Sequence, residues 1–398
     1  MNKPKMIFVC AISLFPKDSG GAVRIFNTIK YLSEAFEIYF FSFKPIDFKL
    51  TYANKKYLRN YTKQYFFFEK KIFKSEDSFF SDFQPYWFAD YESDELKLAI
   101  ANCIKKNQIN IIQVEFTQLL YLVKYLPKSA KKIYIAHDIS TISFLRRIMQ
   151  LKSLRIILTA FFKLVEIYVY ERYYFPKFDI VCSVSNEDQK SIVKWFNVKK
   201  ILTAKNGIEK VNFINKKPPK KIIKLGYIGS FTHTPNKFAI SYFLSEIVPL
   251  LEKKGVQFKF YIAGKNNPYE IKSLITALQL KSKSSIIDLG FTPTVRSFFK
   301  EIDILVAPIF SGSGSRIKIL ESLSFSVPVI SSKIGAEGLS IDNDYLSIAN
   351  NKEEFVQKII DMKEKLSHVD ESQRINLIKS LEPLLWKNIF REYSKKIL

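Results

Sequence analysis

A run of small residues between a strand-like and a helix-like segment is the clearest place for chemistry in this chain. The apolar segment 303–308 ends in Ala-Pro, residues 311–315 alternate Ser and Gly, and a helical pattern begins near Arg316. Glycine lets a ligand approach the backbone, and the N–H groups of a first helical turn suit a diphosphate. Lys318 and Glu321 lie three residues apart, on one helical face. The pattern fits a phosphate-binding loop, and it also fits an ordinary capped helix with a surface ion pair. The candidate residues are Gly314, Ser315 as the expected N-cap, Arg316, Lys318 and Glu321.

Two features of the first half also follow strand-like segments. Gly20 and Gly21 come after the first apolar segment and open a helical pattern, where they can present backbone amides to a phosphate or a sugar. A plain tight turn explains them equally well. His137 follows the apolar segment 133–136, a position typical of a catalytic or ligand-contacting histidine, although a structural histidine is the alternative. No His, Cys or Asp cluster has metal-ligand spacing, so we expect no metal site.

These candidates need elements to position them, and the sequence predicts an α/β protein. Short apolar segments alternate with longer helical ones, which indicates parallel strands with crossover helices. Two prolines among lysines at 215–221 interrupt the alternation and indicate a linker. We therefore expect two doubly wound Rossmann-like domains whose loops after the strands bind ligands. The expected boundaries are 1–212 for the first domain, 213–221 for the linker, 222–375 for the second domain, and 376–398 for a helical segment that packs back on the first.

The formal charge of +24 over 398 residues predicts an anionic partner. Nucleic acid is disfavoured, because only about ten of the 62 basic residues are Arg, the residue best suited to bidentate recognition. An anionic membrane surface and an anionic substrate remain. Abundant Lys, Ile, Phe and Asn with few Gly also fits the codon usage of an AT-rich genome.

The few cysteines and the apolar runs predict a cytoplasmic location. Cys10, Cys103 and Cys182 are far apart and odd in number, so a disulfide framework is not expected. No run of 18 uncharged apolar residues predicts a membrane-spanning helix. Residues 1–15 resemble a signal peptide in their basic start and short apolar stretch, but no small-x-small cleavage site follows, and a buried first strand fits better.

Two aromatic-rich regions allow two interpretations each. Residues 45–90 read either as a helical insertion on the first sheet or as a surface for a large or lipid-linked acceptor. Residues 144–174 read either as a core helix with a solvated face or as a basic, apolar helix that lies on the inner face of an anionic membrane.

Several motifs together resemble a known family. Residues 307–308, 314–323, 327–330 and 335–339 match the donor domain of GT-B glycosyltransferases of family 4 (glycosyl transferases group 1), and so do Gly226–Phe231, Pro235-Asn236 and Ile262-Ala263-Gly264. In the first half, Ser19-Gly20-Gly21, Arg24, His137-Asp138, Glu171-Arg172 and Asn206-Gly207 fall in the family's order. The resemblance covers nearly the whole chain except about 45–90.

This resemblance implies a retaining glycosyltransferase with two Rossmann-like domains that face a central cleft. It would move a sugar from a nucleoside-diphosphate sugar to a saccharide or lipid-linked saccharide in bacterial cell-surface polysaccharide synthesis, without a metal or other cofactor. By this resemblance Glu321 would hold the ribose, and Arg316 and Lys318 would neutralise the diphosphate. Gly20 and Gly21 would face the donor from the other domain, and His137 would contact the donor sugar near its reacting carbon. The implied catalytic residues are His137, Lys318 and Glu321, and the implied donor-binding set adds Gly229 and Ser230 to the loop residues above.

The chain departs from the family pattern in two places. The first glutamate of the family's paired motif falls at Ser313, so the identity of the donor sugar does not carry over. Gly229-Ser230-Phe231 lacks the Arg that many relatives place there, and Arg316 could compensate. A catalytically silent sugar-nucleotide binder and a sugar-nucleotide epimerase are the alternative functions. The sequence leaves open the donor base, the acceptor, the linkage and the oligomeric state.

Overall fold

Two compact units make up the chain in the computed structural model. The first is formed mainly by Met1–Lys205 and Ile389–Leu398, and the second mainly by Asn206–Ser311 and Ser315–Asn388. The structure describes residues 3–44, 48–70, 85–149, 151, 153–216, 218–219, 221–231, 233–265, 268–281, 285–292, 294–312, 316–339, 344–368 and 371–398. The division at residue 205 lies ahead of the expected linker at 213–221, and residues 376–388 of the expected C-terminal segment stay with the second unit.

The first unit contains, in its described part, a seven-stranded parallel sheet in the order β3-β2-β1-β4-β5-β6-β7. Both faces of its central strands are buried; Ile38 to Phe43 of β2 are almost wholly inaccessible, which explains their nearly continuous apolar run. The strands are β1 (Lys5–Cys10), β2 (Glu37–Lys44), β3 (Gln64–Glu69), β4 (Ile111–Glu115), β5 (Lys131–Ala136), β6 (Ile180–Ser183) and β7 (Ile201–Thr203).

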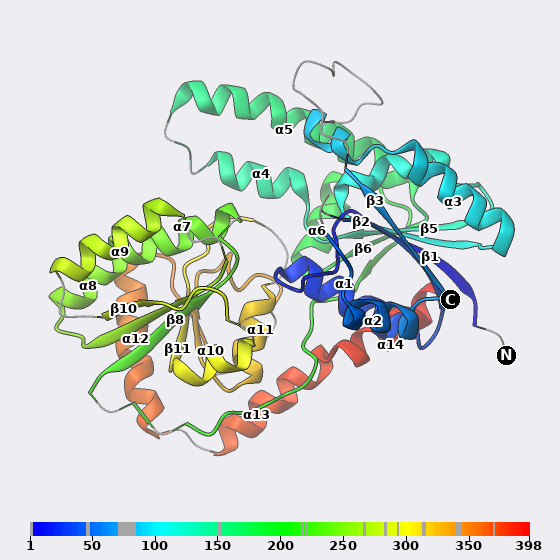
Figure 1. The fold of residues 1–398 in the computed structure, drawn as a ribbon. Helices are drawn as coiled ribbons and strands as arrows, with labels where there is room; N and C mark the ends of the chain where they lie inside the picture. Colours follow the sequence, from blue (N-terminus) through cyan, green and yellow to red (C-terminus); the bar gives the residue numbers. More distant parts are fainter. Residues whose placement is uncertain are drawn as a thin grey trace. The chain divides into compact units, whose positions relative to one another are not determined.

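Helices cover both faces of this sheet. Figure 1 shows α1, α2 and α14 on one face and α3 and α5 on the other. Serine side chains accept a backbone hydrogen bond at the N-terminus of three of these helices, from Ala22, Leu96 and Asp188. The elements are α1 (Gly20–Leu32), α2 (Tyr52–Tyr61), η1 (Tyr86–Tyr91), α3 (Asp94–Asn107), η2 (Thr117–Tyr125), α4 (Ser140–Ile148), α5 (Leu154–Tyr174), η3 (Phe175–Lys177), α6 (Asn186–Trp195) and α14 (Trp386–Ile397).

The second unit repeats the architecture around a six-stranded parallel sheet, as described, in the order β10-β9-β8-β11-β12-β13. Its core is a single cluster of apolar side chains from the strands and the surrounding helices. The strands are β8 (Ile223–Ile228), β9 (Phe258–Ala263), β10 (Ser285–Asp288), β11 (Ile304–Ala307), β12 (Val329–Ser331) and β13 (Leu346–Ile348). The helices are α7 (Thr234–Tyr242), η4 (Phe243–Ile247), α8 (Val248–Lys253), α9 (Tyr269–Lys281), α10 (Val295–Glu301), α11 (Ile317–Ser324), α12 (Lys352–Lys365), η5 (Leu366–His368), α13 (Glu371–Leu381) and η6 (Glu382–Leu384).

The predicted fold class, an α/β chain with two doubly wound parallel sheets, is confirmed. In each sheet the strand order reverses beside the first strand: between β1 and β4 in the first unit, and between β8 and β11 in the second. The carboxyl edge at such a reversal is where doubly wound folds bind ligands. The loops singled out from the sequence follow β1, β5, β8 and β11, so they lie at these two edges.

Several predicted elements are wrong in detail. The expected helical insertion at 45–90 instead supplies α2 and the edge strand β3, because the aromatic run pairs with β2 and stacks Phe66 on Phe41; residues 71–84 lie outside the described part. Residues 144–174, expected to form one helix, belong to two helices, α4 and α5. The buried first strand expected within residues 1–15 is Lys5–Cys10.

Candidate functional site

A half-buried lysine lies at the carboxyl edge of the second sheet. Lys318 is on the first turn of α11, which follows β11 through the Gly-Ser loop. Its Nζ donates to Asn236 Oδ1 at 2.9 Å and to the Tyr227 hydroxyl at 3.1 Å, and it lies 4.2 Å from the centre of the Tyr227 ring. The Tyr227 hydroxyl also donates to Asn236 Oδ1, at 2.7 Å. The ammonium group therefore has neutral hydrogen-bond acceptors at its tip.

Gly229 leaves the space that this lysine occupies. A Cβ at position 229 would lie 2.7 Å from Lys318 Nζ and 2.9 Å from Asn236 Nδ2. Asn236, near the start of α7, is held by the same loop, because its Nδ2 donates to the Ser230 carbonyl at 2.7 Å. The Gly229-Ser230 loop, Asn236, Tyr227 and Lys318 thus form one cradle, which places the predicted residues Gly229, Ser230 and Lys318 together.

Burial makes the charge of Lys318 costly. The pKa of Lys318 is lowered to about 7, chiefly because burial desolvates the ammonium group and also because the Arg316 guanidinium is near, while Glu321 opposes the shift. An anion placed beside Nζ would restore the charged form. The cradle is therefore chemically suited to an anionic group such as a phosphate.

The other predicted residues of this loop have different positions. Arg316 occupies the N-cap of α11 with an extended backbone, so the expected N-cap at Ser315 is wrong; its Nη2 donates to the Ser311 carbonyl at 3.0 Å. Glu321 lies half-buried one turn after Lys318. Gly314 and Ser315, together with Ser313, lie outside the described residues.

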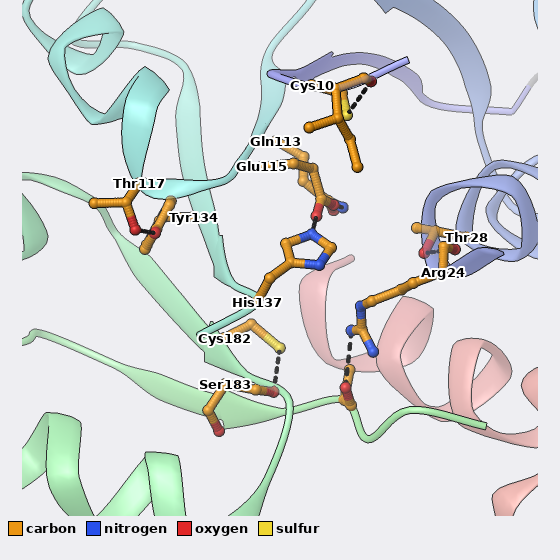
Figure 2. Close-up of polar contacts among 12 residues, drawn as sticks. Cys10, Arg24, Thr28, Gln113, Glu115, Thr117, Tyr134, His137, Cys182 and Ser183 are labelled. Carbon is orange, nitrogen blue, oxygen red and sulfur yellow. Dashed lines mark hydrogen bonds and ion pairs between the residues drawn. The ribbon is translucent and has the colours of Figure 1, made fainter. Parts of the chain in front are cut away.

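In the first unit, His137 is part of a buried polar chain (Figure 2). The ring follows β5, and its Nε2 lies 2.5 Å from Oε2 of Glu115, the last residue of β4. Gln113 Nε2 donates to the other Glu115 oxygen at 2.5 Å, and the Tyr393 hydroxyl donates to Gln113 Oε1 at 2.9 Å. Because a carboxylate oxygen accepts at Nε2, this nitrogen carries the proton, and Nδ1 is the ring's acceptor in the neutral form.

Burial also favours the neutral form of the His137 imidazole. Desolvation lowers the pKa of His137, the hydrogen bond to Glu115 opposes the shift, and the charge on Arg24 adds to it. Arg24, on α1, is itself buried and donates to the carbonyls of Ala204 at 2.8 Å and Lys205 at 3.1 Å. Figure 2 shows its guanidinium on the side of the His137 ring away from Glu115.

An aromatic ring joins His137 to the predicted Gly-Gly loop. Phe116 stacks on His137 with ring centres 3.8 Å apart and planes 6° from parallel. Its φ of 77° is unusual for a bulky residue and costs roughly 1–3 kcal/mol. A Cβ on Gly21 would lie 3.4 Å from this ring and 2.8 Å from Ile12 Cδ1. Gly21, Phe116 and His137 are therefore packed together, whereas Gly20 is exposed at the first position of α1.

Within the part of the chain that the structure describes, no group of three His, Cys, Asp or Glu side chains is arranged to hold a metal ion.

Comparison with known proteins assigns most of the second unit to a protein family. The family model of Glycosyl transferases group 1 matches residues 223–365, the segment that carries the lysine cradle. These residues form a group 1 glycosyltransferase domain. An uncharacterized 44.6 kDa protein in the cps region of Klebsiella pneumoniae is 24% identical over 149 residues, which is 36% of this chain and 38% of that protein. The chain therefore matches well under half the length of this curated relative.

Solved structures show the fold of the whole chain. A glycosyltransferase from Rickettsia africae has a TM-score of 0.63 at 16% identity, covering 99% of this chain and 98% of that one. The HepE protein of Anabaena, solved in complex with UDP and glucose, has a TM-score of 0.60 at 13% identity and covers 99% of each chain. At these identities the likeness concerns the fold, and the fold is GT-B, as predicted.

Some residues of the two edges received no role from the sequence. Asn236, Tyr227 and Arg24 stand in family motifs without an assigned contact, and Glu115 is not among the predicted residues. Glu115 could have been found, since it ends the apolar segment Ile111 to Val114 with an acid at a strand's carboxyl end. No local signal marks Tyr227, whose hydroxyl meets Lys318 across 91 residues.

Proposed function

We propose that this glycosyltransferase is a retaining enzyme of family 4. It moves a sugar from a nucleoside-diphosphate sugar to a saccharide or lipid-linked saccharide acceptor in bacterial cell-surface polysaccharide synthesis. The relative in the Klebsiella cps region supports this setting, and the Anabaena structure makes UDP the first nucleotide to test.

The lysine cradle is the observation that carries the proposal. Among the described residues, the hydrogen-bond acceptors of the Lys318 ammonium group are the neutral Tyr227 and Asn236 side chains, and burial lowers the pKa of Lys318 to about 7. A diphosphate beside Nζ would gain a charge-assisted hydrogen bond and would relieve the desolvation of the ammonium group. The remaining donor-binding residues of the proposal are Gly20, Gly21, Gly229, Ser230, Gly314, Ser315, Arg316 and Glu321, with Glu321 on the ribose.

The proposed reaction needs stabilisation of a leaving diphosphate. The bond between the anomeric carbon and the diphosphate oxygen breaks, and the acceptor oxygen bonds to that carbon on the same face. The acceptor proton passes to the departing phosphate oxygen. Lys318 and Arg316 stabilise the charge that develops on the leaving group, and such preorganised stabilisation is commonly the largest catalytic contribution. His137 contacts the donor sugar near the reacting carbon, with its ring orientation fixed by Glu115 and Phe116.

Titration of UDP-glucose by calorimetry tests the cradle. We expect Lys318→Met to weaken binding about tenfold or more, since a charge-assisted hydrogen bond contributes about 1.5–3 kcal/mol. Lys352→Ala, which breaks an exposed ion pair with Glu246 in the same unit, is the matched control and should bind as the wild type does. Equal affinity of wild type and Lys318→Met would refute the cradle as the diphosphate site. Arg316→Ala gives a second check, and unchanged affinity there would remove Arg316 from the proposal.

A panel of sugar nucleotides tests which donor the protein binds and which reaction it catalyses. Thermal stabilisation by UDP-, GDP- and ADP-sugars ranks the nucleotides, since a ligand that binds the folded state raises its apparent stability. NMR of the product then gives the anomeric configuration, which the proposal expects to match that of the donor. Binding without turnover on any saccharide or lipid-linked acceptor would favour the catalytically silent alternative. Epimerised free sugar nucleotide would favour the epimerase.

We propose that the sugar transfer requires no metal and no other cofactor. The positive charge of Lys318 and Arg316 is the chain's own counter-charge for the diphosphate. Transfer measured after dialysis against EDTA should keep its rate within about twofold, and a loss restored by Mg²⁺ or Mn²⁺ would contradict this part of the proposal.

A further inference from the structure

The helix α5 exposes a continuous apolar stripe. Side chains at intervals of three or four residues are largely accessible along nearly its whole length, so they share one face of the helix. The stripe comprises Leu154 (79% exposed), Leu158 (63%), Phe161 (55%), Phe162 (69%), Val165 (43%), Val169 (47%) and Tyr173 (44%). Met149, between α4 and α5, adds a further side chain that is 78% exposed.

The opposite face of α5 already has its partners. Ile167, Tyr170, Glu171 and Tyr174 are buried against the first unit. The stripe is therefore not the core-facing side of the helix, and the interpretation of 144–174 as a purely core helix with a solvated face does not account for it. Most apolar residues on protein surfaces are scattered singly, whereas contiguous large ones mark a contact with a partner or a membrane.

The charge around the stripe identifies the partner. Arg147, Arg155 and Arg172 are exposed on α4 and α5, while Glu166 is the exposed carboxylate of these two helices in the described residues. Two such faces brought together in a homodimer would place like charges opposite each other, but an anionic bilayer would neutralise them. Aromatic and aliphatic side chains beside arginines are also the composition of helices that lie in the membrane interface.

We propose that the α4–α5 face, defined by the stripe with Met149 and the three arginines, docks on an anionic lipid bilayer. The apolar side chains enter the boundary between headgroups and acyl chains, and the arginines contact lipid phosphates. The described chain contains no helix long and apolar enough to span a membrane, so the contact is peripheral. This inference does not depend on the proposed sugar transfer, because lipid binding can be measured without donor or acceptor.

Vesicle flotation of the full chain tests the docking face. Wild type should float with vesicles containing anionic phosphatidylglycerol, much less with pure phosphatidylcholine, and less again in high salt. The triple substitution Leu158→Ser, Phe161→Ser, Phe162→Ser should reduce partitioning at least tenfold. The matched control replaces Leu98, Phe238 and Tyr269, three exposed apolar side chains elsewhere, with Ser and should float like the wild type. Thermal unfolding of both variants shows that they are folded.

A site-specific probe gives a second, independent measurement. Cys10, Cys103 and Cys182 are buried, so a thiol-reactive environment-sensitive dye will label an introduced surface cysteine selectively. The dye on Phe162→Cys should shift to the blue on addition of anionic vesicles, while the dye on Val193→Cys, 61% exposed on α6, should not.

Three outcomes overturn the proposal. The first is a wild type that does not float with anionic vesicles at low salt. The second is equal flotation of the stripe variant. The third is a wild-type dimer, seen by light scattering, that the stripe substitutions dissociate while vesicle binding is absent, which would assign the stripe to a second copy of the chain.

Discussion

At the scale of single residues, Lys318 combines a buried position with neutral partners. Tyr227 and Asn236 accept its hydrogen bonds, and burial lowers its pKa to about 7. The ligand-free protein therefore loses the Lys318 proton as the pH rises through about 7. A bound diphosphate favours the ammonium form, so donor binding and proton uptake are coupled.

This coupling predicts a pH-dependent donor affinity. UDP-glucose is suited to the test because its diphosphate ester keeps its charge above pH 6. Its affinity should be constant below pH 7 and should fall by up to tenfold for each pH unit above it. Calorimetry between pH 6 and 9 in buffers of different ionisation enthalpy measures both affinity and proton uptake. Lys318→Met should bind weakly with little dependence on pH, and the same slope in this variant would assign the titration to another group.

Glu115 is a positioning residue for His137 in the proposed reaction. Replacing it in Glu115→Gln removes the carboxylate that holds the Nε2 proton, so the other tautomer becomes accessible. We expect kcat to fall about tenfold or more with KM for the donor nearly unchanged, since a carboxylate that fixes a catalytic imidazole can contribute much more than that.

Asp188→Asn is the control for the Glu115 experiment. Asp188 is equally buried in the same unit and accepts a hydrogen bond from the Ser185 hydroxyl at 2.6 Å. A similar loss of kcat in both variants, or a loss that follows their thermal stability, would reduce the role of Glu115 to general folding.

The sequence predicts some residues of the two candidate sites but not the contacts of others. Lys318 and His137 are predicted because each follows a strand of a doubly wound sheet, a position that the alternation of strands and helices fixes. Gly229 is predicted only by the resemblance to the glycosyltransferase family. Glu115 also ends a strand, but its contact with His137, like the contact of Tyr227 with Lys318, depends on which strands become neighbours. Those pairings are long-range and leave no local pattern.

At the scale of elements, one buried carboxylate connects α5 to α4. Glu171, on the inner face of α5, accepts from the Ser140 amide at 2.9 Å, from the Thr141 amide at 3.0 Å and from the Thr141 hydroxyl at 2.5 Å. It serves the N-terminus of α4, where the residue before the helix, Ile139, has no capping side chain. The pair α4–α5 is therefore positioned from the side opposite the apolar stripe.

Substitution of Glu171 should destabilise the first unit. Glu171→Gln weakens this capping, and we expect a loss of about 1–3 kcal/mol in the free energy of unfolding. Glu166→Gln, exposed on the same helix, should change it by less than about 0.5 kcal/mol. Urea denaturation of the two variants makes the comparison, and equal stabilities would contradict the capping role.

The stability loss in Glu171→Gln should also depend on pH. Burial raises the pKa of Glu171 to about 7 from its ordinary 4.5, so its stabilising contribution is complete below pH 4.5 and declines as the pH rises towards 7. The cost of Glu171→Gln should therefore be larger at pH 4.5 than at pH 8.

The edge strand β3 is not evident from the sequence of residues 45–90. Its residues Tyr65 to Phe68 form an aromatic run of the kind that strands favour, but Lys-rich surroundings and the absence of clear alternation obscured it. Pairing with β2 along six residues settles the conformation, because tertiary contacts override weak local preference. The break between α4 and α5 was equally hidden, since no proline or glycine marks it.

At the scale of the whole molecule, the end of the chain completes the first unit. Residues 389–398 belong to it, although the intervening residues 206–311 do not. Tyr393 is buried and donates to Gln113 on β4 across 280 residues, and Lys131 donates to the carbonyl of Ile397 at 2.8 Å. The hydrogen bond of Tyr393 is the far end of the polar chain that reaches His137.

Loss of the Tyr393 side chain should therefore destabilise β4, which is distant from it in the sequence. Tyr393→Ala removes a buried ring and a hydrogen bond, and the first unit should lose about 3 kcal/mol or more. Hydrogen exchange of β4 should accelerate, whereas the exposed neighbour substitution Glu392→Ala should leave it unchanged. Unaltered protection of β4 in Tyr393→Ala would show that α14 does not support this strand.

Figure 1 makes the repeated architecture of the two units plain, and this is the level at which the sequence is most informative. Alternating apolar strands and helices predict two parallel sheets before any contact is known. The return of residues 389–398 to the first unit depends instead on buried side chains such as Phe390 and Tyr393, and the hydrogen-bond partner of Tyr393 is 280 residues away in the sequence.

The packing of Gly21 against Ile12 and Phe116 has a consequence for evolution. A methyl group at position 21 would meet Ile12 at 2.8 Å, and Phe116 in turn lies flat on His137. These four positions cannot drift independently. Among descendants of a common ancestor, Ala at position 21 should appear together with a smaller residue at position 12, and loss of the aromatic ring at 116 should accompany loss of the histidine.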